Sequence, residues 1–416
     1  MTRRLRLLLL VLTLFTATAG CGLGAPGGSD AEVKVTILGP WAGDQERRFK
    51  EVLDGFGIPY AYQGTAATRE VLLAEVQAGD PPDIAILPGI GDLVEYAVDR
   101  RLQPLKGLYD PAEYGNPWRP RAARVPGDLW VPLKADLKSV VWYRKDSAPP
   151  TGPAPLTSWC MGMVDDGASG WPGSDWIEDL ILQRAGPVLY ARWATGDLKW
   201  TDDPVVDAWT AWAGLLAQDP DPELATVHGM LRADHRGPDG GHGLLFAGGC
   251  DLEHQGSFAR AFYGGLRDRA AFVDSAALLP GGPYTVKGHE VAADFAALFG
   301  RSPEAREMLR RLASKEGQEA WGRTGGVFSA NAAVAPKTGP VDREVSGRFT
   351  DQRVPLCLDA SDVMPAVVRD AFYEAVLLTM AHPGEPVRTW LRDVQRVQDA
   401  QPRDAPRLTG VCGRPQ

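Results

Sequence analysis

The chain has 416 residues, a formal net charge of −9 and 44% hydrophobic residues. Its length exceeds that of one ordinary core of about 100–200 residues, so we expect two structural parts. No long basic run follows the first six residues. This excludes a nucleic-acid partner, because phosphate binding needs clustered Lys and Arg. Thirteen Trp residues are a high count, and their flat apolar faces suggest a stacking site.

The N-terminus combines three arginines, an apolar stretch and then small residues. This order predicts a secretory signal over residues 1–20, too short to span a bilayer as a mature helix. Residues 18–21 (Thr-Ala-Gly-Cys) resemble a lipobox, although Thr18 stands where that motif usually has Leu. We therefore expect lipidation of Cys21, a tether over 21–32 and a location at the outer face of the cell membrane. Cleavage to a fully soluble protein is the alternative.

Four further cysteines suggest disulfides, because their number is even and the chain is expected to be exported. They are Cys160, Cys250, Cys357 and Cys412. Three pairings are possible, and we prefer Cys160 with Cys250 and Cys357 with Cys412. No two cysteines have the C-x₂₋₄-C spacing of a zinc site.

Three histidines recur every seven residues, at 228, 235 and 242, but Gly and Pro between them preclude one helix. We expect no metal and no cofactor.

The first third of the chain alternates between expected strands and expected helices. The strands cover 33–38, 59–63 and 83–87, and the helices cover 44–56, 69–78 and 91–101. This β-α order is typical of a parallel sheet covered by helices. Ligands of such sheets bind at the carboxyl ends of the strands. The loops there are Gly39–Gly43, Gly64-Thr65 and Pro88-Gly89.

The remaining chain is expected to mix strands and helices. Residues 129–143 form a long extended stretch that could pass from one part to the other, and 219–242 resemble an exposed loop. Further strands are expected over 157–164, 244–247, 272–277 and 327–334. Further helices are expected over 176–184, 205–218, 290–299, 303–315 and 318–321, and through most of the last 50 residues.

Seven segments in order carry a family resemblance. They are residues 38–43, 78–88, 131–136, 139–143, 168–179, 254–258 and 358–365. Together they resemble the family 1 extracellular solute-binding proteins, the maltose-binding-like receptors of carbohydrate ABC importers. The resemblance implies a two-lobed α/β fold of the periplasmic-binding-protein type II, with the ligand in a cleft. It implies one lobe over 33–136 and 274–328, and another over 137–273 and 329–416.

The resemblance also implies a sugar site made of aromatic and polar side chains. A sugar ring has apolar C–H faces, which indole covers, and a rim of hydroxyls, which polar side chains satisfy. Trp171 lies between Gly and Pro, a poor setting for a core aromatic. Packing, capping or structural ion pairing is the alternative role for each candidate. The candidates are Trp41, Gly64, Thr65, Lys134, Asp136, Trp171, Asp175, His254, Gln255, Gly325 and Gly326.

The leading hypothesis is a monomeric substrate-binding lipoprotein that captures a carbohydrate and delivers it to an ABC permease. It makes and breaks no bond, and the sequence has no G-x-S-x-G, H-E-x-x-H or P-loop motif. A lipid-anchored sensor or scaffold that kept the fold without sugar transport is the second hypothesis. A secreted glycosidase is the third, because the helix over 176–184 and the residue before it carry three carboxylates.

Overall fold

The computed structural model describes residues 34–238, 242–325, 327–335, 339–402 and 405–415. Residues outside these ranges include the expected signal peptide, the expected tether with Cys21, and Gly326. The signal, the lipidation and the role of Gly326 in the site remain predictions. In the described part, no helix has both the length and the apolar character needed to cross a membrane.

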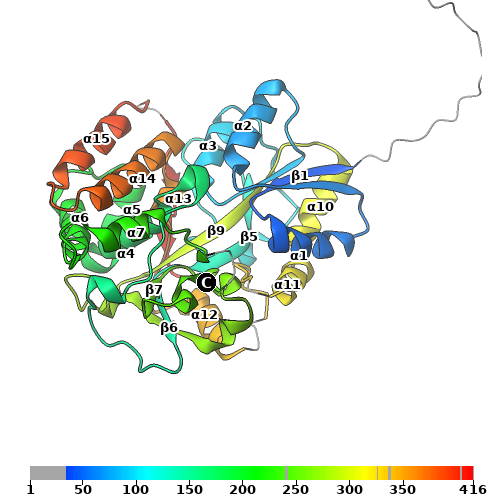
Figure 1. Ribbon diagram of the computed structural model, residues 1–416. Coiled ribbons are helices and arrows are strands. Elements are labelled where there is room, and N and C mark those ends of the chain that lie inside the picture. The colour runs from blue at the N-terminus through cyan, green and yellow to red at the C-terminus, as the bar shows by residue number, and fades with distance from the viewer. Residues whose placement is uncertain (1–33, 239–241, 326, 336–338, 403–404, 416) are drawn as a thin grey trace, which may run out of the picture. The chain divides into compact units, whose positions relative to one another are not determined.

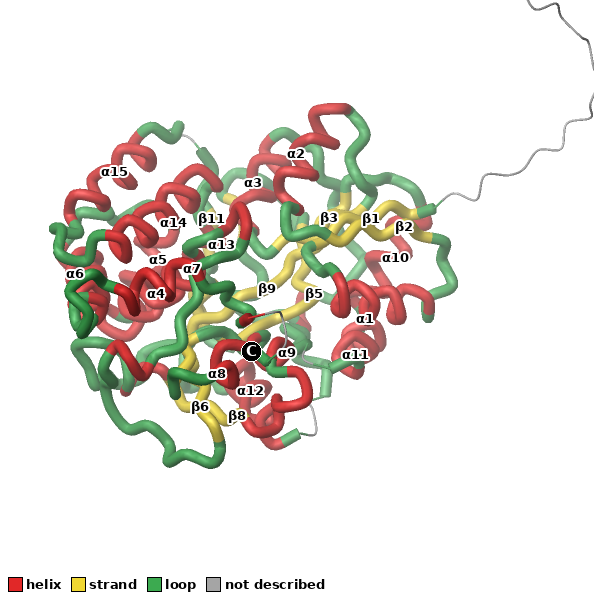
Figure 2. The backbone as a smooth tube through the Cα atoms, in the orientation of Figure 1, coloured by secondary structure: helices red, strands yellow, loops and turns green. Residues whose placement is uncertain are grey.

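A seven-stranded sheet contains the first strands of the chain. Six of its strands follow the order β12-β10-β9-β3-β1-β2. The seventh, β5, pairs with β9. The strands are β1 (Val35–Gly39), β2 (Tyr60–Gly64), β3 (Ile84–Leu87), β5 (Trp130–Leu137), β9 (His289–Leu298), β10 (Leu356–Leu358) and β12 (Cys412–Gly413). Strands β2 and β3 run parallel to β1, whereas β9 is antiparallel to β3 and β5. Figure 2 shows β5 and β9 side by side between the helices.

The expected β-α alternation at the start of the chain is confirmed. Its helices are α1 (Gly43–Asp54), α2 (Thr68–Ala78) and α3 (Ile90–Val98). Helix α1 buries Phe49, Val52 and Leu53 along one face, the i, i+3, i+4 spacing of an amphipathic helix. All four residues of β3 are buried, as expected for a parallel strand covered on both faces.

Strand β9 corrects the helix expected over 290–299. Its alanines favour a helix when considered alone. In the structure β9 lies between β3 and β5 and also pairs with β10, and nine of its ten residues are buried. Because small side chains fit such a central position, tertiary packing overrides the local preference.

A second sheet, of three strands, begins directly after β5. Its order is β7-β6-β8, with β6 (Val140–Arg144), β7 (Leu252–His254) and β8 (Ala270–Asp274), all antiparallel. The extended stretch expected over 129–143 is therefore β5 followed by β6, with Lys138-Ser139 between them. The chain passes from the large sheet to the small one at this point.

The other helices cover the two sheets (Figure 1). They are α4 (Trp171–Ala185), α5 (Pro187–Ala194), α6 (Asp203–Leu216), α7 (Ala225–Arg232), α8 (Gly243–Ala247), α9 (Ala259–Phe262), α10 (Pro303–Ala313), α11 (Lys315–Arg323), α12 (Pro340–Thr350), α13 (Ala360–Val363), α14 (Ala366–Ala381) and α15 (Arg388–Asp399). Two short strands, β4 (Arg121–Ala122) and β11 (Leu408–Thr409), form a separate pair.

Four local predictions need correction. The strand expected over 244–247 is helix α8, and the loop expected over 219–242 contains helix α7. The described residues of 157–164 and 327–334 form isolated bridges instead of strands. Short apolar runs do not distinguish a strand from a buried helix or an irregular segment, and this ambiguity explains the errors.

The two preferred disulfides are present. Cys160 is bonded to Cys250 and Cys357 to Cys412, at sequence separations of 90 and 55 residues. The first joins Cys160, which follows the 3₁₀ helix Leu156–Ser158, to the loop between α8 and β7. The second joins β10 to β12, which also pair as strands at the edge of the large sheet. The C-terminal segment is therefore fixed to that edge.

Replacing Cys357 and Cys412 together by Ala should lower the free energy of unfolding by about 2–4 kcal/mol, because the bond restricts the unfolded chain. Urea denaturation without reductant measures the change. The matched double variant at Cys160 and Cys250 should lose a similar amount, since closure entropy grows slowly with loop length. A loss below about 0.5 kcal/mol for the first variant would contradict this expectation.

Candidate ligand-binding site

Two of the predicted site residues, Lys134 and Asp136, form a buried ion pair on β5. Lys134 Nζ lies 2.6 Å from Asp136 and 3.6 Å from Asp294 on β9. The Ser257 hydroxyl donates to Asp136 over 2.8 Å, and the Trp41 indole donates to Asp294 over 3.1 Å. Five side chains from four parts of the chain therefore form one polar group. This arrangement fits a structural ion pair as well as a ligand-binding role for Lys134 and Asp136.

A second buried group is centred on Lys138, which sequence reasoning missed. Its Nζ lies 2.8 Å from Asp175 on α4 and 3.1 Å from Asp359 after β10. The same ammonium stands 4.9 Å from the ring centre of Trp171 and 5.4 Å from that of Phe258. Positive charge over aromatic faces is attractive, so Lys138 holds these two rings beside the carboxylates.

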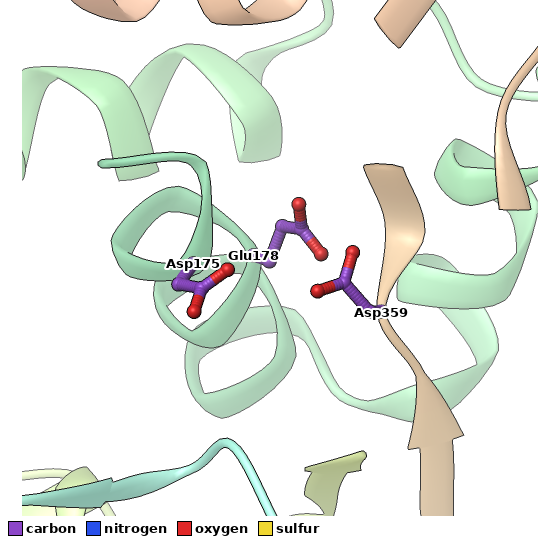
Figure 3. Close-up of side chains that lie close together, drawn as sticks. All are labelled: Asp175, Glu178 and Asp359. Carbon is purple, nitrogen blue, oxygen red and sulfur yellow. The ribbon is translucent and has the colours of Figure 1, made fainter. Parts of the chain in front are cut away.

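In the described part of the chain, three carboxylates near Lys138 have the spacing of metal ligands. Oxygens of Asp175, Glu178 and Asp359 all lie within 4.8 Å of one another, and all three side chains are buried. Figure 3 shows the first two on helix α4, facing Asp359 at the end of β10. Backbone N–H groups of Ala360 and Ser361 donate to Glu178. Since the Lys138 ammonium already lies against the other two carboxylates, we assign no metal here.

Burial determines how these carboxyl groups ionise. It raises the pKa of Asp175 to about 7, against the opposing charge of Lys138. Burial and the neighbouring carboxylates also raise the pKa of Glu178 and that of Glu290 on β9. Burial alone would raise the pKa of Asp359, but the Lys138 charge and its hydrogen bonds lower it. The Lys138 charge therefore favours the ionised form of Asp359, whereas burial outweighs that charge at Asp175.

Trp171 is half-buried at the start of α4. Its indole N–H donates to Asp165 over 2.8 Å, and its ring meets His235 and Phe258 edge-on at 4.9 and 5.7 Å. It is thus held in a fixed orientation by polar and aromatic partners. A fixed, partly exposed indole is suited to stacking against a ligand.

The other predicted residues on β7 and beyond it are deeply buried. His254 Nε2 lies 2.9 Å from Asp179, and its ring packs on Trp176 at 4.7 Å. Gln255 donates from its side chain to the His235 carbonyl, and its own carbonyl accepts from Trp142. Each therefore already serves the packing of the small sheet.

The predicted residues after β1 and β2 lie close together. Trp41 is only 2% exposed, and its ring packs on Phe49 and Trp321 at 4.6 and 5.0 Å. A Cβ on Gly64 would lie 2.1 Å from the Trp41 carbonyl, so only Gly fits there. Thr65 accepts through its hydroxyl from the Ala67 N–H at the start of α2. The loops meet as expected, with the indole faces of Trp41 covered by protein.

A cavity of about 660 Å³ lies next to α9. Residues of α1, α9, α11, α12 and the 3₁₀ helix Gly264–Arg269 line it. Trp118, Phe328 and Phe349 form an aromatic part of its wall. Among the predicted residues that the structure describes, Gly325 lines it. Its size falls within the range of about 300–1,000 Å³ that is common for small-molecule pockets.

Curated relatives span most of the chain, although no family model matches the sequence. The chain is 29% identical over 378 residues to the osmoprotective compounds-binding protein GgtB of Synechocystis, covering 82% of this chain and 87% of GgtB. It is 27% identical over 377 residues to the alpha-glucosides-binding periplasmic protein AglE of Rhizobium meliloti, covering 80% of each.

Solved structures show the same architecture. The maltose-maltodextrin binding protein of Alicyclobacillus acidocaldarius matches with a TM-score of 0.60 at 13% identity, over 88% of this chain and all of that one. The chain is similar to extracellular solute-binding proteins in sequence and in fold. The solute receptor AcbH matches with a TM-score of 0.66 at 15% identity, over 88% of this chain and 98% of that one. The expected two-lobed type II fold is confirmed.

Lys138 could have been found from the sequence. Lys134, Asp136 and Lys138 are spaced by two residues, and side chains at that spacing point to the same face of a strand. Asp359 and Phe258 gave no such local signal, because only the fold brings α4, β10 and the segment after β7 together.

Replacing Lys138 by Met should lower the free energy of unfolding by about 3–5 kcal/mol, because it leaves Asp175 and Asp359 buried without a counter-charge. The loss should be larger at pH 8 than at pH 5, where the carboxyls can take up protons. Urea denaturation at both pH values measures it. Lys106→Met, at an exposed lysine, is the control and should change little. Equal stability of the Lys138 variant and the wild type would contradict the compensating role.

A neighbouring carboxyl, Glu253 on β7, predicts a pH effect. Burial raises its pKa to about 8, although the Tyr263 hydroxyl and the Leu245 N–H donate to it. Between about pH 4.5 and 8 the folded protein therefore holds a proton that the unfolded chain releases. Glu253 should therefore lower the free energy of unfolding by up to about 1.4 kcal/mol for each pH unit as the pH rises through that window.

Glu253→Gln should remove that contribution, because an amide of the same shape does not titrate. Denaturation at pH 5, 6.5 and 8 should then show a flatter pH dependence than in the wild type. Glu316→Gln, at an exposed position, is the control and should keep the wild-type slope. An unchanged slope in Glu253→Gln would show that Glu253 is ionised in the folded protein.

Proposed function

We propose that this protein is the receptor of an ABC importer and that it captures a carbohydrate between its two lobes. The observation that carries the proposal is the pair of rings, Trp171 and Phe258, held by Lys138 beside buried hydrogen-bonding groups. Rings next to polar side chains match a sugar, which offers C–H faces and hydroxyls together. The relation to AglE, whose name states binding of alpha-glucosides, supports the same ligand class.

We further propose that the lobes follow the expected boundaries, 33–136 with 274–328 and 137–273 with 329–416. The passage of the chain from the large sheet to the small one between β5 and β6 supports the first boundary. Closure of the lobes on the ligand would exclude water and create the form that the permease recognises. The proposed anchor is a lipid on Cys21, and the proposed working form is a monomer.

The arrangement of carboxylates supports a receptor that performs no chemistry. A glycosidase needs two carboxyl groups on opposite sides of the scissile bond. Asp175 and Asp359 instead flank the Lys138 ammonium, and Glu178 accepts from backbone N–H groups. These three side chains are at most 2% exposed, so no substrate bond can lie between them.

A thermal-shift and calorimetric screen of mono-, di- and oligosaccharides on the purified protein tests the proposed function. At least one sugar should raise the melting temperature, because binding to the folded state alone stabilises it. No shift across a broad library would favour the sensor or scaffold hypothesis. Release of free sugar from an oligosaccharide would favour the glycosidase.

Replacing Trp171 by Ala should weaken the binding of the sugar found in that screen by at least roughly tenfold, because an aromatic stacking surface is lost. Isothermal calorimetry measures the change. Trp390→Ala is the matched control, since Trp390 is half-buried on α15, which lies apart from these residues. Unchanged affinity in the Trp171 variant would remove that residue from the site.

A further inference from the structure

The cavity beside α9 carries more positive charge than its carboxylates compensate. Four arginines line it: Arg48, Arg260, Arg267 and Arg323. The acidic side chains in its wall are Asp268, Glu319 and Asp342. Arg260 contacts both Asp342 and Asp268, and Glu319 lies 3.9 Å from Lys315. Three guanidinium groups are therefore left without a carboxylate partner in the described part of the chain.

Two of these guanidinium groups converge on one point of the cavity wall. A Cβ on Gly325 would lie 3.4 Å from Arg267 Nη1 and 3.6 Å from Arg48 Nη1. Gly325 has a φ of +97°, so a side chain there would be strained. Gly325 therefore leaves open the space in which the two positive charges face each other.

Arg48 and Arg267 reach this point from different parts of the fold. Arg48 lies on α1 and Arg267 on the 3₁₀ helix Gly264–Arg269, which the proposed boundaries assign to different lobes. Arg48 donates to the Gly325 carbonyl at 3.4 Å. Among the described residues, no hydrogen bond or ion pair engages the Arg267 side chain. Like charges this close repel each other unless an anion lies between them.

The rest of the cavity wall is suited to a sugar ring. Trp118, Phe328 and Phe349 contribute aromatic surface. The neighbouring polar side chains are already paired, since Ser329 donates to Gln318 and Asn331 donates to Glu113. Arg260 is 8% exposed, and its Nε has no hydrogen-bond partner among the described residues. Guanidinium donors next to aromatic surface fit a ring that carries a carboxylate or phosphate.

We infer that the cavity takes an acidic sugar, whose anionic group is held between Arg48 and Arg267, with Arg323 adding positive charge at the same cavity. The inference rests on the proposed function and narrows its ligand class to uronic acids and their oligomers, or phosphorylated sugars. It places the acidic part of that ligand in this cavity, which Trp171 and Phe258 do not line. The anion would also join α1 to the 3₁₀ helix Gly264–Arg269. Binding of the acidic group and closure of the lobes would then be coupled, because the two arginines come from different lobes.

Calorimetry with matched pairs of ligands tests the inference. The probes are galacturonate and its di- and trimer, galactose and neutral galacto-oligosaccharides of the same lengths, glucose 6-phosphate with glucose, and inorganic phosphate alone. At least one acidic sugar should bind roughly tenfold or more tightly than its neutral counterpart, since hydrogen bonds to charged groups are the stronger ones. That preference should decrease as salt is added.

Arg267→Gln should reduce the preference for the acidic sugar to less than about threefold and leave affinity for the neutral sugar unchanged. The Arg267 side chain is exposed and has no hydrogen bond or ion pair with the residues that the structure describes, so its loss should not lower the melting temperature. Arg323→Gln should reduce the preference by a smaller factor. Arg101→Gln, at an exposed arginine after α3, is the matched control and should keep the wild-type preference.

Each other outcome has a distinct meaning. If neutral sugars bind as tightly as acidic ones, the inference is overturned and the proposed function stands. If inorganic phosphate binds as tightly as any acidic sugar, the cavity is an anion site without a sugar role, and the inference is again overturned. If no sugar of either kind binds, the proposed function fails with it.

Discussion

The attraction between the Lys138 ammonium and the carboxylates of Asp175 and Asp359 is the constraint on which much of the structure depends. Lys138 stands where the chain passes from the large sheet to the small one, and its backbone N–H donates to the Glu290 carbonyl of β9. Through this one side chain, β5, β6, α4 and the residue after β10 are held together. A buried charge is tolerated only with such partners, so the position of each element is coupled to the others.

The same ammonium links the packing of the protein to its proposed ligand site. It lies over the rings of Trp171 and Phe258, and Phe258 also lies 5.8 Å from Lys134. The two buried polar groups are therefore neighbours across one aromatic ring. Lys138 therefore orients the two rings and also compensates the charge of the buried carboxylates.

The fold could be predicted from the sequence where local and tertiary preferences agree. The first three strand–helix units have alternating or buried apolar patterns, and all three are confirmed. The expected helix over 290–299 is wrong because alanine-rich β9 takes its conformation from its neighbours β3, β5 and β10. In the candidate site, Lys134, Asp136, Trp171 and Asp175 could be chosen from loops and strand spacing. Asp359 and the arginines of the cavity could not, since residues far apart in sequence meet there only after folding.

The late position of β9 in the chain has a consequence for biosynthesis. A chain emerges from the ribosome N-terminus first. Strands β3 and β5 are made early, but their shared central partner ends at Leu298, and the edge strand β12 is made last. Until then the early strands expose unpaired edges, which favour association with other chains. The nascent chain therefore cannot complete its large sheet before β9, β10 and β12 have left the ribosome.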